Sequence, residues 1–538
     1  MKDNTLSQYV DEIKYFLKHK LYYIPVLIVA LFSYGFLVTH YSVNIDTLSS
    51  ERYFEQGLLL GQGRLTAAVI HKIFNVMEFN PFLVDGIAVI ILILAAIGMC
   101  TLFKRITKDK LSLASYTIFS CLFLSYPLIN EIFVYTPASI SISLGFFMVS
   151  ISLIIMYESL NKAKFGWILL TGIILFLATS LYESFLIVYL VGIFIILILH
   201  CLVNKLKFKG MVEIFLMLLI PALISVVLEF TLPELIIKIF GIERNGNAEK
   251  SILYGELGII GGIKNLGITM LEKYFINGLF YLPIAVFVFS NIACIISSIF
   301  LSIKNKNFMF ILLFLGLMIG TISLSILQGE AATYRTCQTF QVFCPFAIVI
   351  LYEIINANTK QTLKIATTIA VSILIFYQVK DLHTIFYLNY VRYEEEKNTL
   401  IKVCNEIEAK YGNEKPVVFC GSYQLSNYLT DKIYVKKEDN RMELARKILK
   451  CFDEGADTYD DDYKYIEASI NSYLTWAQRA FDEVNTELYK WMDMLGYKFK
   501  TVDINVIKKY IQYIRNENEI LKTETEIIEM EDFILVNI

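Results

Sequence analysis

Long apolar runs recur along this chain as far as Lys380, and each has the roughly 20 residues that an α-helix needs to cross the hydrocarbon core of a bilayer. No water reaches the backbone in that core, so each spanning segment must satisfy its own N–H and C=O groups, as a helix does. The hydrophobic share of 56% also exceeds that of a typical soluble domain. The pattern therefore predicts a polytopic α-helical membrane protein.

The apolar runs predict eleven transmembrane helices. They lie at 21–40, 82–103, 111–128, 137–157, 165–181, 185–203, 211–231, 278–303, 307–328, 341–357 and 362–379. With this count, the connections rich in lysine and arginine all fall on one side of the membrane, which the positive-inside rule makes the cytoplasm. We therefore expect a cytoplasmic N-terminus, with residues 1–20 as an interfacial helix, and a location in the cytoplasmic membrane.

Composition changes at Lys380. The chain from that residue onward carries 22 basic and 30 acidic residues, whereas the preceding part carries 26 and 21. This shift predicts a transmembrane domain at 21–379 and an extracytoplasmic α/β domain at 380–538. Within the latter we expect a helix that ends at Gly412, strands at "KPVVFCG" and "DFILVNI", and a helical stretch around 463–495 closed by Gly496.

Charged residues concentrate in the connections predicted to lie outside, although charge near a membrane is expensive and calls for a reason. The outer connections are a first loop at 41–81, a loop at 232–277, and turns at 126–136, 178–185 and 329–340. The candidate site residues are Asp46, Glu51, Arg64, Asn130, Glu131, Tyr182, Glu183, Lys273, Tyr334 and Arg335. Taken singly, Asp46 is equally explained as a polar residue at the membrane exit, and Arg335 as an interface residue. Ordinary turn carboxylates, a solvated lysine and interface anchors are the simpler single explanations of Glu131 and Glu183, of Lys273, and of the tyrosines. The apolar pattern that begins after Arg64 predicts a helix along the outer interface.

No metal site is expected. The nine cysteines form no CxxC pair and no cluster with histidine. We also expect no cofactor and no nucleic-acid partner.

The first outer loop reads "NIDTLSSERYFEQGLLLGQGRL", with an acidic residue after the first span and a Gly-Arg pair at the start of a surface helix. Further along come "SLYESF" and then, in order, "YEEEKNTLIKVCNEI", "KPVVFCG" and "MDMLGYKF". In this order the segments resemble the Gtr-type (type II) bacterial integral membrane glucosyltransferases of the GT-C superfamily. Thr47 stands where that family often has a second acidic residue, and Glu183 replaces the glutamine of a Tyr-Gln motif.

The resemblance implies a GT-C-like catalytic domain and an inverting transfer of a hexose, most often glucose. The donor would be a polyprenyl-phosphate-linked sugar, and the acceptor a cell-surface glycan outside the membrane: O-antigen, teichoic acid or wall polysaccharide. It also implies partner proteins, a polyprenyl-phosphate glucosyl synthase and a flippase. A surface-polysaccharide polymerase and a lipid-linked sugar flippase or transporter remain alternatives.

The roles that the resemblance suggests divide the candidates into three groups. Asp46 would be the general base, with Glu51 or Glu131 as the second carboxylate. Arg64, Arg335 and Lys273 would bind the donor phosphate. The sugar or the acceptor would be bound by Glu183, Tyr182, Asn130 and Tyr334.

A first prediction concerns the general base. Asp46→Asn keeps the size of the side chain but cannot take the proton from the acceptor hydroxyl, so kcat should fall by about 10²- to 10⁴-fold. Transfer from polyprenyl-phosphate-hexose by the purified variant measures this. A normally inserted variant that transfers at the wild-type rate would rule out the assignment.

Overall fold

The computed structural model describes residues 5–40, 42–43, 58–74, 81–162, 165–204, 208–242, 252–276, 282–420, 486–502 and 526–537. Two of the predicted catalytic residues, Asp46 and Glu51, lie outside the described residues. The site can therefore be built only from the remaining candidates.

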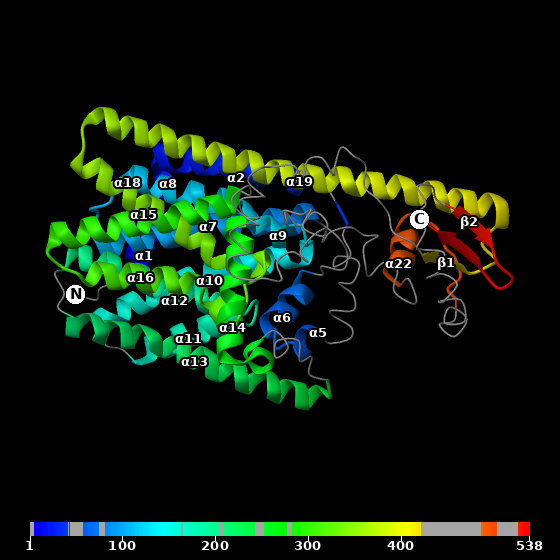
Figure 1. Cartoon of the computed structure of the whole chain (residues 1–538), viewed down its shortest axis with the longest axis horizontal. Helices are drawn as coiled ribbons and strands as arrows, with labels where there is room; N and C mark the ends of the chain where they lie inside the picture. Colours follow the sequence, from blue (N-terminus) through cyan, green and yellow to red (C-terminus); the bar gives the residue numbers. More distant parts are fainter. Residues whose placement is uncertain are drawn as a thin grey trace.

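Apolar helices packed side by side form the main body of the molecule (Figure 1). They are α2 (Lys20–Thr39), α7 (Pro81–Thr107), α8 (Leu113–Ser125), α10 (Thr136–Lys162), α11 (Phe165–Thr179), α12 (Phe185–Val203), α13 (Phe208–Phe240), α15 (Leu282–Asn305), α16 (Met309–Thr321), α18 (Gln338–Asn358) and α19 (Gln361–Tyr411). Each predicted span coincides with one of them. In the described part of the chain, nine helical segments have the length and composition to cross a membrane, while α11 and α16 are shorter. The chain is a mostly helical multi-pass membrane protein.

The last span does not stop at the membrane surface. The sequence predicts a span at 362–379 followed by a separate helix, but α19 runs through both as one helix of 51 residues. It ends at Gly412, whose φ of 68° lies in the left-handed region and whose N–H bonds the carbonyl of Glu408. Figure 1 shows α19 passing along the whole bundle and on to the C-terminal strands.

Three short strands form a mixed sheet beyond the end of α19. β1 (Val417–Cys420) pairs in parallel with β3 (Ile534–Asn537), and β2 (Glu526–Glu529) pairs antiparallel to β3. β1 and β3 confirm the two strands predicted from sequence, and β2 was not predicted. The helix α22 (Thr486–Met494) packs against them through Trp491, which is fully buried beside Tyr393 of α19. The rest of the α/β domain predicted at 380–538 lies outside the described residues.

A buried arginine of α19 holds the start of the first outer loop. Arg392 and Glu396 are fully buried and form an ion pair at 3.4 Å. Arg392 also donates to the carbonyl of Val43 at 3.0 Å, and Asn389 donates to the Ser42 hydroxyl at 2.8 Å. A buried charge is tolerated only when it is paired and hydrogen-bonded, so this arrangement fixes the chain at Val43.

The opposite end of the bundle is closed by α1 (Thr5–Lys18), which confirms the helix predicted at 1–20. Arg105, at the end of α7, binds Glu12 of α1 at 2.9 Å and also pairs with Glu158 of α10. All three side chains are largely buried. The network joins α1 to two spanning helices.

Short helices lie at the end of the bundle that faces the sheet (Figure 1). They are α5 (Leu58–Gly61), α6 (Leu65–Ile73), the 3-10 helix η2 (Pro127–Ile129), α9 (Asn130–Phe133), α14 (Tyr254–Met270), the π-helix η4 (Leu271–Ile276), α17 (Ser323–Gln328) and the 3-10 helix η6 (Tyr334–Thr336). The helix predicted after Arg64 is α6. The stretch predicted as a loop at 232–277 is largely helical instead, because α13 continues to Phe240 and α14 follows.

Glycines let the spanning helices approach closely, as is common in membrane bundles. A Cβ added at Gly145 of α10 would lie within 2.0 Å of the buried ring of Phe185, the first residue of α12. We therefore expect Gly145→Ala to destabilise the protein by about 1–3 kcal/mol, the usual cost of overpacking. Gly166→Ala is the matched control, because no atom lies within 4 Å of its Cβ position. Thermal unfolding in detergent should show a lower Tm for the first variant alone; equal Tm values would contradict this packing.

Candidate active site at the end of the bundle that faces the sheet

A bidentate ion pair joins Arg64, directly before α6, to the turn between α11 and α12. Arg64 donates from Nε to Oε1 of Glu183 at 3.1 Å and from Nη2 to Oε2 at 3.2 Å. Gly63, with φ of 83°, makes the turn that places Arg64 directly before α6. About half of the Glu183 side chain is exposed. Exposed pairs contribute little to stability, so an anionic ligand can compete for this guanidinium.

The ring of Tyr182 brings the two candidate arginines to one place. The guanidinium carbon of Arg64 lies 4.7 Å from the ring centroid, a cation–π contact. Burial raises the pKa of the Tyr182 hydroxyl, and the positive charges of Arg64 and Arg335 oppose that rise. Both guanidinium groups therefore act on the same ring. The structure thus brings together Arg64, Tyr182, Glu183 and Arg335, which lie far apart in sequence.

Backbone and hydroxyl contacts hold α6 against this turn. The hydroxyls of Thr66 and Ser180 lie 2.5 Å apart, and the N–H of Ala67 donates to the carbonyl of Ser180. These contacts fix the position of Arg64 relative to Tyr182 and Glu183.

A buried glutamine links the same turn to Arg335. Gln338, the first residue of α18, accepts at Oε1 from the Ser184 hydroxyl at 2.7 Å. Its Nε2 donates to the Arg335 carbonyl at 2.5 Å. Both hydrogen bonds are buried or partly buried, so the amide has one satisfied orientation. The chain of contacts runs from Arg64 through Glu183, Ser184 and Gln338 to Arg335.

Lys273 of η4 and Tyr334 of η6 form a second cationic contact. The ammonium of Lys273 lies 4.6 Å from the Tyr334 ring centroid, and the Tyr334 hydroxyl donates to the Lys273 carbonyl at 3.2 Å. Tyr334 is buried and is occupied in holding η4 against η6. Burial raises the pKa of the nearby Cys337 thiol to about 11; the charge of Lys273 lowers it and that of Glu131 raises it. The charges of Lys273 and Glu131 therefore act on the same thiol in opposite directions.

The sequence places Asn130 and Glu131 in an exposed outer turn, but the structure buries both. Pro127 starts η2, which leads directly into α9, and both side chains are buried there against neighbouring helices. Neither polar atom of the Asn130 amide has a hydrogen-bond partner among the described residues. A buried amide without partners is costly, so Asn130 is suited to a ligand or an ordered water.

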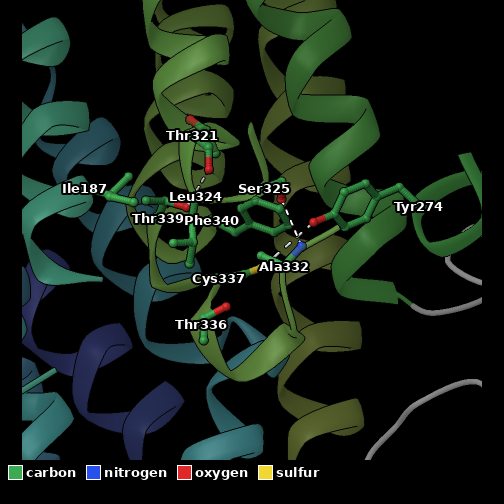
Figure 2. A pocket seen from close by; sticks show the side chains of 10 residues that line it. All are labelled: Ile187, Tyr274, Thr321, Leu324, Ser325, Ala332, Thr336, Cys337, Thr339 and Phe340. Carbon is green, nitrogen blue, oxygen red and sulfur yellow. Dashed lines mark hydrogen bonds between the residues drawn. The ribbon is translucent and has the colours of Figure 1, made fainter. Parts of the chain in front are cut away.

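Two small cavities flank the segment that carries Arg335. One is lined by Arg335, Tyr334, Gln338, Gln341 and Tyr126, together with isoleucines of η2, α9 and α10 and other neighbours. The other lies behind Cys337 and is shown in Figure 2, where Tyr274 points from η4 toward Cys337 and Ser325. Arg335 is one of the few polar side chains that line the first cavity, together with Gln338 and Gln341.

Sequence reasoning missed two carboxylates near this end of the bundle. Glu229 of α13 accepts from the Thr179 hydroxyl at 3.2 Å and lies 3.5 Å from the Cβ position of Gly63. Asp85 of α7 is buried and accepts from the Ser139 hydroxyl at 2.5 Å. The signal for both was a single acidic residue inside an apolar run, which is rare unless it is functional or paired.

Among the residues with described positions, no three His, Cys, Asp or Glu side chains are grouped so as to hold a metal ion. The described site is instead rich in guanidinium and ammonium groups, which favour an anionic ligand.

A bundle of membrane-crossing helices with arginines and carboxylates gathered at one end defines a multi-pass membrane protein with its candidate site at that end. The family model for glucosyl transferase GtrII matches residues 35–352, and the chain belongs to this family. The match confirms the resemblance, includes Arg64, Glu183 and Arg335, and makes the chain a glycosyltransferase. Neither the curated proteins nor the solved structures provide a significant match.

A prediction follows from the double contact of Gln338. Gln338→Glu replaces the donor that holds the Arg335 carbonyl with an acceptor, so Arg335 should lose its fixed position. We expect the KM for the sugar donor to rise by about tenfold with a smaller change in kcat, because a displaced Arg335 guanidinium would bind the donor anion less well. The matched control is Gln361→Glu at the exposed first residue of α19.

A double-mutant cycle separates positioning from a general structural effect. If Gln338 acts through Arg335, the effect of Gln338→Glu should disappear in an Arg335→Ala background. Strictly additive effects on KM would show that Gln338 does not act through Arg335.

Proposed function

We propose that this protein is an inverting glycosyltransferase that moves glucose from a polyprenyl-phosphate carrier onto a cell-surface glycan outside the cytoplasmic membrane. The proposal rests on the exposure of Arg335 and on its lack of an ion-pair partner among the described residues. Its side chain is exposed, its charge lowers the pKa of Tyr182 as that of Arg64 does, and no carboxylate of the described residues forms an ion pair with it. An anion is the natural ligand for such a group.

The anion that fits is the phosphate of the donor. As the bond between the anomeric carbon and the phosphate oxygen breaks, negative charge grows on the leaving polyprenyl phosphate. Guanidinium groups bind phosphate oxygens in pairs, and donors that are already in place stabilise such charge as it develops. Arg335 is the primary phosphate ligand in this proposal. Arg64 joins it by exchanging the Glu183 carboxylate for the phosphate, and Lys273 adds positive charge from η4.

The place of the site supports a lipid-linked donor. Arg64, Glu183 and Arg335 all lie in connections at the ends of spanning helices, where a lipid phosphate would stand. The Arg105 network and the Lys104–Asp109 ion pair lie at the opposite end. By the positive-inside rule that opposite end is cytoplasmic, so the site and the C-terminal sheet face outward.

Asp46 is the proposed general base. It follows Val43 by three residues, and Val43 is held by Arg392 of α19. The carboxylate takes the proton of the acceptor hydroxyl as that oxygen bonds to the anomeric carbon from the face opposite the phosphate, which inverts the configuration. Glu51 or Glu131 supplies the second carboxylate. The buried amide of Asn130 binds sugar or acceptor hydroxyls, and the outer domain contacts the acceptor glycan.

The prediction concerns the phosphate contact. Arg335→Ala should raise the KM for polyprenyl-phosphate-glucose by about 10- to 100-fold, which corresponds to the 1.5–3 kcal/mol of a hydrogen bond to a charged group. The KM for the acceptor should not change. Lys402→Ala, which removes an exposed cation on the outer part of α19, is the control. An unchanged donor KM in both Arg335→Ala and Arg64→Ala would refute the phosphate site.

The same purified protein distinguishes transfer of one sugar from related chemistries. We expect a single hexose to be added to each acceptor position when polyprenyl-phosphate-glucose is the donor. Growth of a chain would instead indicate a polymerase, and movement of the lipid across vesicles without transfer would indicate a flippase.

A further inference from the structure

The helix α14 lies across the bundle. The spanning helices run along the long axis of the view in Figure 1, whereas α14 is drawn nearly at right angles to them at the end that carries the candidate site. It packs on α17 and is kinked at Gly258, whose φ of 68° is not helical. A helix in this orientation cannot be a membrane span.

One face of α14 is apolar and uncovered. Ile259 is 74% exposed and Ile260 is 85% exposed. The exposed aliphatic residues of this segment are Ile252, Leu257, Ile259, Ile260 and Ile263. Large aliphatic side chains are stabilised by leaving water, so a patch of five strongly favours an apolar environment.

The apolar face of α14 continues onto α17, the short helix on which it packs, where Leu327 is also exposed. The spanning helices likewise carry exposed apolar side chains, which meet the hydrocarbon of the membrane. Glu256 and Lys264 of α14 are exposed and can contact water or headgroups. A helix that lies flat at the membrane boundary with apolar and charged sides is an interfacial helix.

Hydrogen bonds tie α14 to the segment that leads to Arg335. Leu253 donates its N–H to the Gln328 carbonyl at 2.9 Å, and the Tyr254 hydroxyl donates to the Ile326 carbonyl at 2.8 Å. At the other end of α14, Asn265 donates to the Gly329 carbonyl, and Thr269 accepts from the N–H of Ala331, both at 2.9 Å. Both ends of α14 are therefore hydrogen-bonded to residues 326–331.

The element after α14 also contacts the segment that bears Arg335. This element, η4, directs the Tyr274 hydroxyl to the Cys337 sulfur at 3.9 Å, two residues after Arg335 (Figure 2). The ring of Tyr254 also contacts Gly329, where a Cβ would lie 3.3 Å from it. Movement of α14 would thus move the whole segment that bears Arg335.

We propose that α14 is an interfacial helix whose isoleucine face is immersed in the hydrocarbon of the outer leaflet, and that it holds Arg335 at the depth of lipid phosphates. The consequence for donor use rests on the proposed function, but the immersion itself does not.

Immersion is tested directly by fluorescence. Ile260→Trp in liposomes of phosphatidylcholine brominated on the acyl chains should show quenching beyond that of the parent protein with its three tryptophans. Lys402→Trp, on the exposed outer part of α19, is the control and should show none. Absence of extra quenching at Ile260 would overturn the proposal. In that event, a change of oligomeric state in Ile260→Asp would identify a second copy of the chain as the cover.

The role in setting depth is tested with two donors. The double variant Ile259→Ser and Ile260→Ser should raise the KM for a full-length polyprenyl-phosphate-glucose severalfold, with kcat at saturating donor and the KM for a water-soluble short-chain prenyl-phosphate-glucose unchanged. Arg335→Ala should instead raise the KM for both donors. Equal effects of the double variant on both donors would refute the depth role and leave the phosphate site standing.

Discussion

The hydrocarbon core of a bilayer offers no partner to a polar group, and this constraint decides where the chain can keep its chemistry. The spanning helices satisfy their own backbones and pack through small residues such as Gly145. Ionised groups are confined to the helix ends or to pairs. The described cationic clusters accordingly lie at the two ends of the bundle, and what lies at each end can be compared directly.

The two ends treat arginine in opposite ways. At the end closed by α1, Arg105 is enclosed by Glu12 and Glu158, and its charge is already compensated. At the end that faces the sheet, Arg64 pairs with a half-exposed glutamate, and Arg335 has no ion-pair partner among the described residues. The first arrangement is complete without a ligand and holds helices together. The second lacks an anion, which is why phosphate chemistry is assigned to that end of the molecule.

The sequence predicted the spans well because the length of an apolar run is a local property. It also predicted that Arg64 and Glu183 belong to one outer surface, since orientation alone brings outer connections together. It could not predict that the two side chains form a pair, nor that Gln338 contacts Ser184 across 154 residues, because these contacts depend on how distant helices pack. The burial of Asn130 and Glu131 was missed for the same reason. The unbroken helix α19 was missed because a change in composition does not by itself end a helix, and Gly412 is the first residue that does.

The continuity of α19 has a mechanical consequence. A helix that crosses the membrane and continues without a break, glycine or proline cannot bend sharply at the surface. The roughly 30 residues from Lys380 to Tyr411 hold the sheet about 45 Å further along the helix axis. The sheet is therefore held at a fixed distance from the end of the predicted span, and it cannot swing toward the bundle as it could on a flexible linker.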